Sequence, residues 1–300
     1  MKINVGIVGY GNLGKAIEEQ IQNNKTFNLV GIFSRRNLSN TTPLEQIVDY
    51  KNKIDVLFLC GGSQNDLEIQ ATKLIKHFNT IDCYDNHNRL ESYVNKMNSL
   101  AKTHNKVALC AFGWDPGLFS LMRGLFSSLG YIPNTFWGKG TSQGHTQAIK
   151  QIDGVIDAIQ FTVPNPEAIE KTLNGMFVEK EKMHTRECYV VCEKQNEEKI
   201  KNQIINMPDY FKGYSTHVSF VSQEELNEMK TYSHKGTVLT KNNTINFSLN
   251  IDSNPNFTAN IMINFAKSIK NLINENNFGA YTIYDIATNN IMEENKFNLL

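Results

Sequence analysis

The pattern of hydrophobic and polar positions changes at about residue 120. Up to that point, short apolar runs alternate with segments in which apolar residues recur every three or four positions. Short apolar runs predict buried strands, and the longer spacing predicts amphipathic helices. The expected strands are Ile3–Val8, Leu29–Phe33, Val56–Cys60, Thr80–Tyr84 and Val107–Phe112, and the expected helices are Asn12–Asn23, Gln64–His77 and Arg89–Thr103. This alternation predicts an α/β fold, a doubly wound parallel sheet of the Rossmann type.

Beyond residue 120 the apolar and polar positions alternate over longer stretches, which predicts an antiparallel sheet in a second, α+β domain. The expected strands are Ala158–Val163, Glu187–Cys192, His217–Val221, Thr237–Thr240 and Thr244–Ile251, with helices at Pro166–Leu173 and Glu197–Asn206. One long helix, Phe257–Ile273, is expected to pack back on the first domain. We therefore predict a first domain of residues 1–118, completed by residues 256–300, and a second domain of residues 119–255.

Composition and charge narrow the classes of protein. The 300 residues suit two domains rather than one core, and the formal net charge is zero without a long basic run. We therefore expect no nucleic-acid or membrane partner. No apolar run reaches the roughly 18 residues that cross a bilayer, and the N-terminal segment is typical of a strand, so a cytoplasmic protein is expected. The five cysteines are an odd number in mostly apolar runs, which predicts reduced core residues and no metal site.

A glycine motif follows the first expected strand. Gly9-Tyr10-Gly11-Asn12-Leu13-Gly14 matches the G-x-G-x-x-G pattern and opens an amphipathic helix, the context that gives this short pattern its meaning. Gly9 permits the tight turn, Gly11 lets the backbone approach a pyrophosphate, and Gly14 lets the helix lie close to the strand. The free N–H groups of the helix N-terminus favour phosphate. The motif predicts a dinucleotide site.

Two further segments indicate which dinucleotide binds and where it lies. The second strand ends in Ser34-Arg35-Arg36, with no acid before Glu45. A carboxylate at this position favours NAD, whereas two guanidiniums bind a 2′-phosphate, so NADP is predicted. The third strand ends in Gly61, Gly62 and Ser63, where the loop is expected to pass close to the cofactor. An ordinary turn is the alternative for this loop.

Two acids follow the ends of neighbouring strands. Asp85 comes directly after Thr80–Tyr84, and Asp115 lies in Gly113-Trp114-Asp115-Pro116-Gly117 after Val107–Phe112. Ligands of open α/β sheets bind at the carboxyl ends of the strands, so these acids suit a substrate ammonium. Either acid is also a plausible helix cap.

With these motifs in place, the chain resembles the meso-diaminopimelate D-dehydrogenase family over nearly its whole length. The resemblance rests on the glycine motif, Phe33-Ser34-Arg35-Arg36, Tyr84-Asp85-Asn86-His87, Gly113-Trp114-Asp115-Pro116-Gly117, Phe136-Trp137-Gly138, Ser142-Gln143-Gly144-His145, Met207-Pro208-Asp209-Tyr210-Phe211 and Asn254-Pro255-Asn256-Phe257-Thr258-Ala259. It implies the NADP-dependent, reversible oxidative deamination of meso-2,6-diaminopimelate at its D-centre, a homodimer, and a second domain for dimerisation and substrate binding.

The resemblance also implies roles for single residues. Asp85 and Asp115 match family acids that face the reacting D-amino end, and Trp114 matches a tryptophan of the pocket wall. The pocket segments of the family include Trp137, Gln143 and Gly144. The distal L-centre is held in the family by residues that match Thr162, Arg186, His234 and Asn254. For His234 and Asn254, an ordinary loop role is the alternative.

The reaction leaves one role open, since the substrate amine must be neutral before hydride leaves and no lysine is an evident base. We assign Asp85 and Asp115 to binding and orienting the amine. The rival enzyme is a related NADP reductase of a sugar or small aldehyde, although this chain lacks the Glu-Lys-Pro motif common there. The rival from another class is a regulator that binds NADP without turnover.

Overall fold

The computed structural model describes residues 2–63, 66–208, 210–230, 233–292 and 296–298, and it divides into two compact units. Unit 1 comprises residues 1–124 and 254–300, and unit 2 comprises residues 125–253. Helix α4 (Leu118–Ser128) runs across the boundary. No helix in the described part of the chain is long and apolar enough to cross a membrane.

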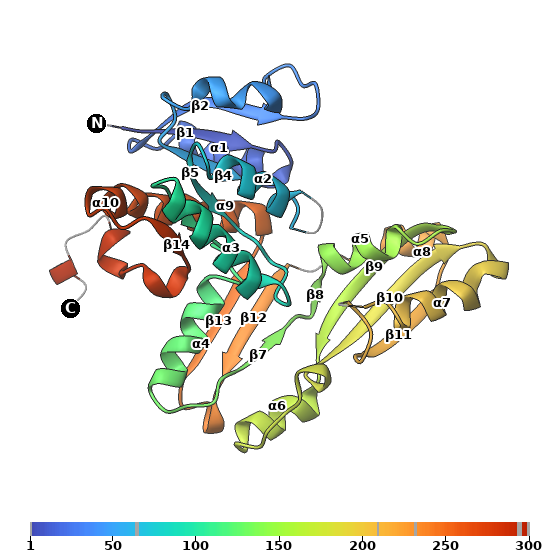
Figure 1. Cartoon of the computed structure of the whole chain (residues 1–300). Coiled ribbons are helices and arrows are strands. Elements are labelled where there is room, and N and C mark those ends of the chain that lie inside the picture. The colour runs from blue at the N-terminus through green and yellow to red at the C-terminus, as the bar shows by residue number, and fades with distance from the viewer. Residues whose placement is uncertain (1, 64–65, 209, 231–232, 293–295, 299–300) are drawn as a thin grey trace. The chain divides into compact units, whose positions relative to one another are not determined.

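Unit 1 contains a seven-stranded parallel sheet in the order β14-β6-β5-β4-β1-β2-β3, with β1 and β4 adjacent at the point where the strand order reverses (Figure 1). Its strands are β1 (Ile3–Val8), β2 (Phe27–Ser34), β3 (Thr42–Pro43), β4 (Val56–Leu59), β5 (Asn79–Asp82), β6 (Val107–Leu109) and β14 (Gly279–Tyr281). Its other helices are α1 (Asn12–Gln22), α2 (Leu67–Leu74), α3 (Leu90–Thr103), α9 (Asn254–Ala266) and α10 (Ser268–Asn274). This order confirms the predicted Rossmann-type fold class.

Both faces of this sheet are covered, and β4 shows how. Val56 and Phe58 pack into one buried cluster together with residues of α1 and α9, whereas Leu57 and Leu59 pack into another together with residues of α2 and α3. Every β4 side chain is therefore buried, which explains the continuous apolar run in the sequence.

The C-terminal segment differs from its prediction. The expected single helix Phe257–Ile273 is wrong, because two helices, α9 and α10, meet at Lys267. Their apolar side chains pack into the cluster that includes α1, as the sequence predicts. The short strand β14, which the hydrophobic pattern did not reveal, pairs with β6 at the edge of the sheet. The expected start of α2 at Gln64 lies outside the described residues.

Unit 2 contains two sheets, in the orders β11-β10-β9-β8 and β13-β12-β7 (Figure 1). Its strands are β7 (Asn134–Trp137), β8 (Gly140–Thr141), β9 (Val155–Pro164), β10 (His184–Cys192), β11 (Ser215–Phe220), β12 (His234–Leu239) and β13 (Asn246–Ile251). Its helices are α5 (Gln143–Lys150), α6 (Pro166–Leu173), α7 (Glu197–Ile205) and α8 (Gln223–Glu228). The α+β class and the antiparallel pairing are confirmed, and the one parallel pair among the described strands of unit 2 is β10 with β11, which α7 connects.

Local signals explain several helix starts in unit 2. Asn165 accepts a hydrogen bond from the Glu167 N–H, and Pro166 occupies the first turn of α6, where a missing N–H costs nothing. Ser222 and Glu225 form a capping box at the start of α8. Ser142 likewise caps α5 by accepting from the His145 N–H.

Candidate active site

The glycine loop has the geometry that a bound dinucleotide requires. Gly9 adopts a φ of +92°, and a Cβ placed on Gly14 would lie 2.2 Å from the Gly9 carbonyl oxygen. Gly11, by contrast, would point a Cβ into open space, with nothing within 4 Å. Tyr10, Asn12 and Leu13 complete the loop, and Asn12 begins α1. The first and third glycines therefore serve the fold, and the second leaves the helix N-terminus accessible to a phosphate.

Two arginines follow β2, as the sequence predicts, and each has a partner. The Ser34 hydroxyl accepts from the Arg36 N–H at 3.0 Å, and the Arg36 guanidinium donates to the Tyr10 carbonyl at 2.6 Å. Arg36 therefore reaches back to the glycine loop. Arg35 forms an ion pair with Asp66 at 2.5 Å. Asp66 stands 31 residues away in the chain, and no local sequence signal identifies it.

The loop after β4 joins the cofactor loop to one of the acids. A Cβ on Gly9 would lie 3.2 Å from the backbone of Cys60 and 3.5 Å from the Gly61 nitrogen, so the two loops adjoin. The Gly62 carbonyl accepts from the N–H groups of Asp66 and Leu67, which starts α2. The Ser63 hydroxyl accepts from the Asp85 N–H at 3.1 Å. Ser63 thus fixes the backbone that carries Asp85.

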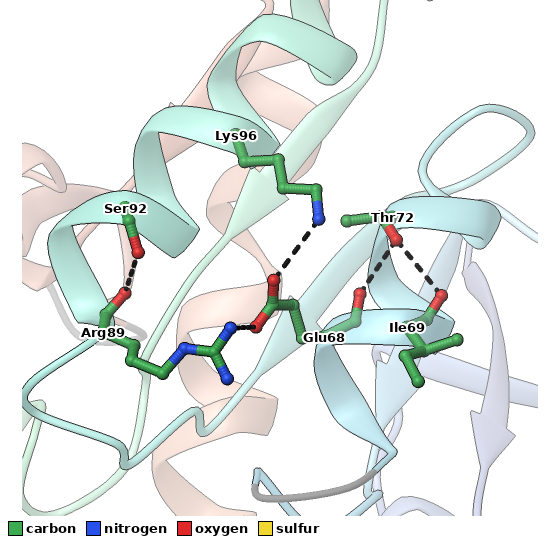
Figure 2. A network of polar contacts seen from close by, with 6 residues as sticks. All are labelled: Glu68, Ile69, Thr72, Arg89, Ser92 and Lys96. Carbon is green, nitrogen blue, oxygen red and sulfur yellow. Dashed lines mark hydrogen bonds and ion pairs between the residues drawn. The ribbon is translucent and has the colours of Figure 1, made fainter.

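A surface network connects the helices that follow these loops (Figure 2). Glu68, in the first turn of α2, lies 3.3 Å from the Arg89 guanidinium at the start of α3 and 3.3 Å from the Lys96 ammonium. Both cations are more than half exposed, so each pair contributes less than about 1 kcal/mol. The network therefore links α2 and α3 at the surface but adds little to the stability of the fold.

Asp82, at the end of β5, is a buried acid that the sequence analysis did not single out. It is fully buried, and its carboxylate accepts from the Tyr84 N–H at 3.0 Å, the Ala111 N–H at 2.9 Å and the Tyr93 hydroxyl at 2.5 Å. Burial raises the pKa of Asp82, and these three hydrogen bonds oppose the shift. Its own carbonyl accepts from the Phe112 N–H at 2.7 Å. Asp82 therefore holds together the strand ends from which the Asp85 and Asp115 loops begin.

The Asp115 loop is a tight turn. The Gly113 N–H donates to the Pro116 carbonyl at 3.0 Å, and a Cβ on Gly117, whose φ is +134°, would lie 1.8 Å from the Gly113 carbonyl oxygen. Only glycine fits position 117. Trp114 packs edge-to-face on Phe119, with ring centroids 5.8 Å apart. The geometry therefore explains the glycine at the end of this motif.

Asp115 is paired, whereas the Asp85 side chain is exposed and forms no ion pair with the described residues. The Asp115 side chain is 11% exposed, and its Oδ1 accepts from the Arg123 guanidinium. Its Oδ2 lies 3.9 Å from Nε2 of His87. Arg123 and His87 are thus further residues of the candidate site, in addition to the two acids predicted from the sequence. The signal for His87 was the Asp85-Asn86-His87 stretch, whereas Asp115 precedes α4, so no helical spacing identifies Arg123.

In unit 2, Arg186 lies in the interior of β10. It stands opposite Thr162 of β9 and donates to the Thr162 hydroxyl at 3.0 Å, while its guanidinium carbon lies 4.5 Å from the centre of the Tyr214 ring. Its Nε is buried without a hydrogen-bond partner in the described part of the chain, and no carboxylate of that part forms an ion pair with it. Burial lowers the pKa of Arg186, and the hydrogen bond to Tyr214 opposes the shift. A partly buried cation with one unpaired donor suits an anionic ligand group.

Two histidines beside Arg186 are held neutral. Burial, and then the positive charge of Arg186, lower the pKa of both His145 and His184 to about 3. His184 uses its neutral Nε2 to accept from the Trp137 N–H at 2.7 Å. His145 lies 2.7 Å from the Ser142 hydroxyl and packs edge-to-face on Tyr210. The stretch with His145 was singled out from the sequence, and His184 lies close to Arg186 in the chain. That both histidines are uncharged and hold neighbouring groups in place was not predicted.

The remaining predicted pocket residues of unit 2 gather around residues 137–144. Gly138 approaches so closely that a Cβ would lie 2.0 Å from the Thr162 carbonyl oxygen, and Trp137 pairs with Gly236. His234 begins β12, and burial lowers its pKa. Gln143 and Gly144 form the exposed first turn of α5. Trp137, Thr162, Arg186 and His234 are therefore neighbours in one part of unit 2.

Asn254 belongs to unit 1, where it is the first residue of α9, and its side chain accepts from the Thr258 hydroxyl at 3.1 Å. The predicted site residues thus divide between the two units. Within the described residues, no three His, Cys, Asp or Glu side chains are grouped as metal ligands would be.

Comparisons with known proteins give one consistent result. Residues 113–253 match the model of the diaminopimelic acid dehydrogenase C-terminal domain. A meso-diaminopimelate D-dehydrogenase of Acetivibrio thermocellus is 44% identical, with 95% of this chain and 92% of that protein covered. A C. glutamicum DAP dehydrogenase in complex with DAP superposes with a TM-score of 0.91 at 36% identity, over 99% of this chain and 98% of that one. An engineered D-amino acid dehydrogenase bound to NADP⁺ gives a TM-score of 0.87 at 34% identity, over 100% and 98%.

Proposed function

The chain belongs to the meso-diaminopimelate D-dehydrogenase family, and we propose that it catalyses the NADP-dependent, reversible oxidative deamination of meso-2,6-diaminopimelate at the D-centre. The products are L-2-amino-6-oxopimelate, ammonia and NADPH. The observation that carries the proposal is the partly buried Arg186, whose Nε is buried without a hydrogen-bond partner and which has no carboxylate partner in the described chain. A substrate with a second carboxylate, far from the reacting carbon, satisfies it. We place the enzyme in the cytoplasm and in diaminopimelate and lysine metabolism.

We assign the NADP site to three loops of unit 1: residues 9–14, residues 34–36 and residues 61–63. The open space beside Gly11 fits the pyrophosphate, and the adjacent guanidiniums of Arg35 and Arg36 fit a 2′-phosphate. When bound, the nicotinamide of NADP⁺ accepts the hydride. The protein's contribution is to bind and orient both reactants.

We assign the substrate groups by their charges. Asp85 and Asp115 bind the reacting ammonium, and Trp114 forms a wall of the pocket. At the distal L-centre, Arg186 binds the carboxylate. The other residues assigned to the distal centre are Thr162, His234 and Asn254, and those assigned to the pocket lining are Trp137, Gln143 and Gly144. Asp115 is already paired with Arg123, whereas Asp85 forms no ion pair within the described residues, so we assign the uncompensated negative charge at the reacting end to Asp85.

The test is an NADP⁺ reduction assay over a panel of D-, L- and meso-amino acids. We expect meso-diaminopimelate to be turned over far faster than any simple D-amino acid, and L-amino acids to be inert. Activity on a sugar or small aldehyde alone would favour the reductase alternative. Cofactor binding without turnover of any of these compounds would favour the regulator.

Cofactor preference gives a second prediction. We expect Arg35→Ala and Arg36→Ala to weaken NADP⁺ binding roughly ten- to a hundredfold, since losing one charged phosphate contact costs about 1.5–3 kcal/mol. NAD⁺ binding should change little. Titration calorimetry with both cofactors checks this, with Arg89→Ala as a control that removes an exposed arginine outside the three loops. Equal losses for NADP⁺ and NAD⁺ would show that the pair does not bind the 2′-phosphate.

We also propose that the protein is a homodimer formed through unit 2. Around the end of α4, Leu125, Leu129 and Ile132 are 49%, 59% and 77% exposed, which is unusual for neighbouring large apolar side chains. We expect a dimer in sedimentation at micromolar concentration. Leu129→Glu with Ile132→Glu should give a folded monomer, and a wild-type monomer would contradict the proposal.

A further inference from the structure

The proposed reaction needs a group that takes a proton from the substrate ammonium, because a C–H bond next to a charged ammonium does not give up hydride. The loops after β4 and β5 carry several titratable side chains. Burial raises the pKa values of the Cys60 and Cys83 thiols and of the buried Tyr84 hydroxyl, so these groups stay protonated and do not accept. The Asp82 carboxylate is occupied by three hydrogen bonds. None of the four is free to act as the base.

Apart from Asp85 and Asp115, which we assign to binding the ammonium, His87 remains, and its position is unlike that of the other groups. It follows Asp85 by two residues on the loop after β5, and its side chain is 47% exposed. Its Nε2 faces Oδ2 of Asp115 at 3.9 Å, while Oδ1 of the same carboxylate is fixed by Arg123. Arg123 is itself held by the Ser120 hydroxyl at 3.1 Å. The carboxylate is therefore anchored on one side and presents its other oxygen to the imidazole.

This arrangement matches what a general base requires. Imidazole ordinarily titrates near neutral pH, whereas a carboxylate with an ordinary pKa near 4 is a weak base there. An anchored carboxylate beside the ring orients it and stabilises the imidazolium that forms. Catalytic hydrogen bonds are often long before substrate binds, so 3.9 Å is compatible with the role. The exposed side of the ring gives the proton a path to water.

We propose that His87 is the general base of the reaction, a role that rests on the proposed function. A ring nitrogen of neutral His87 accepts one proton from the substrate ammonium and leaves a neutral amine. The C–H electron pair then leaves as hydride, with NADP⁺ as the oxidant, and the nitrogen lone pair forms the C=N bond. Water adds to that carbon, the C–N bond breaks, and ammonia leaves. The imidazolium returns its proton to the departing ammonia or to water.

The test compares His87→Asn with the control His77→Asn, which makes the same chemical change at an exposed site. His77 precedes β5, whereas His87 follows it, so the two histidines lie at opposite ends of that strand. We expect His87→Asn to lower kcat for meso-diaminopimelate about 10²- to 10⁴-fold, the usual contribution of a general base. KM should change by less than about threefold and the Kd for NADP⁺ should not change, because a base acts on the reacting proton. The control should behave as wild type.

Chemical rescue separates a base from a structural residue. His87→Ala leaves space for a small base, so added imidazole should raise the kcat of this variant at least about tenfold. It should not change the kcat of wild type. If wild type turns over the substrate but His87→Asn keeps kcat within about threefold, or imidazole restores nothing, His87 is not the base while the proposed function stands. If wild type itself does not oxidise meso-diaminopimelate, both proposals fail.

Discussion

Replacing Arg186 by alanine is expected to lower kcat/KM for meso-diaminopimelate about 10²- to 10³-fold while hardly changing the slow rate with D-alanine. Arg186 is partly buried, hydrogen-bonded to Thr162 and stacked on Tyr214, without a carboxylate partner in the described chain. Truncating one partner of a buried charged pair costs about 2–5 kcal/mol, which includes leaving the other charge unpaired. D-alanine has no second carboxylate, so it makes no such contact to lose.

The measurement is kcat/KM for both substrates in wild type, Arg186→Ala and Arg186→Met. The methionine variant retains a long side chain beside Tyr214 and tests whether packing alone accounts for the loss. Arg89→Ala, an exposed arginine in the Glu68 network, is the control. Equal losses for both substrates would mean that Arg186 supports the fold or the reacting end, and the assignment of a distal carboxylate site would be wrong.

The sheet of unit 1 was predictable because its strands are buried on both faces. Such strands read as continuous apolar runs, of which Val56–Leu59 is the clearest example. The edge strand β14 has only three residues, and its pairing with β6 joins positions about 170 residues apart, so local periodicity does not reveal it. The break between α9 and α10 at Lys267 contains neither glycine nor proline, and the apolar spacing continues across it.

The contacts of the candidate site, like the elements of the fold, were predictable only where their cause is local in the sequence. Gly14 and Gly117 have local reasons that a motif records, since each avoids a clash with backbone only a few residues away, and Gly9 adopts a positive φ. The partners of the charged groups have no such local reason, and no motif records them. Asp66 reaches Arg35 across 31 positions, and Asp82 reaches Ala111 across 29. Such contacts depend on the order of strands in the sheet, so they become visible only once the fold is known.

The neutral histidines of unit 2 lead to the second large prediction, a loss of stability in mild acid. His145 and His184 have pKa values of about 3 in the folded chain, against about 6.5 when unfolded. Above pH 6.5 neither state binds the protons, so the full stability is present. As the pH falls from 6.5 toward 3, only the unfolded chain binds them, and stability decreases by about 1.4 kcal/mol per pH unit for each histidine. At pH 5 we expect the buried His184 to lower the free energy of unfolding by about 2 kcal/mol, and the half-buried His145 to lower it by less.

Urea unfolding between pH 7.5 and 5 checks this, followed by the fluorescence of Trp137. The chain has two tryptophans, so a Trp114→Phe background leaves Trp137 as the reporter of unit 2. His184→Gln removes one titrating ring and retains an acceptor for the Trp137 N–H, so the dependence on pH should become shallower. Arg186→Met should also reduce it, because the charge of Arg186 is the second cause of both low pKa values. If neither variant changes the slope, other groups control acid unfolding. If both do, the cation proposed to select the distal carboxylate also keeps its two neighbouring histidines uncharged.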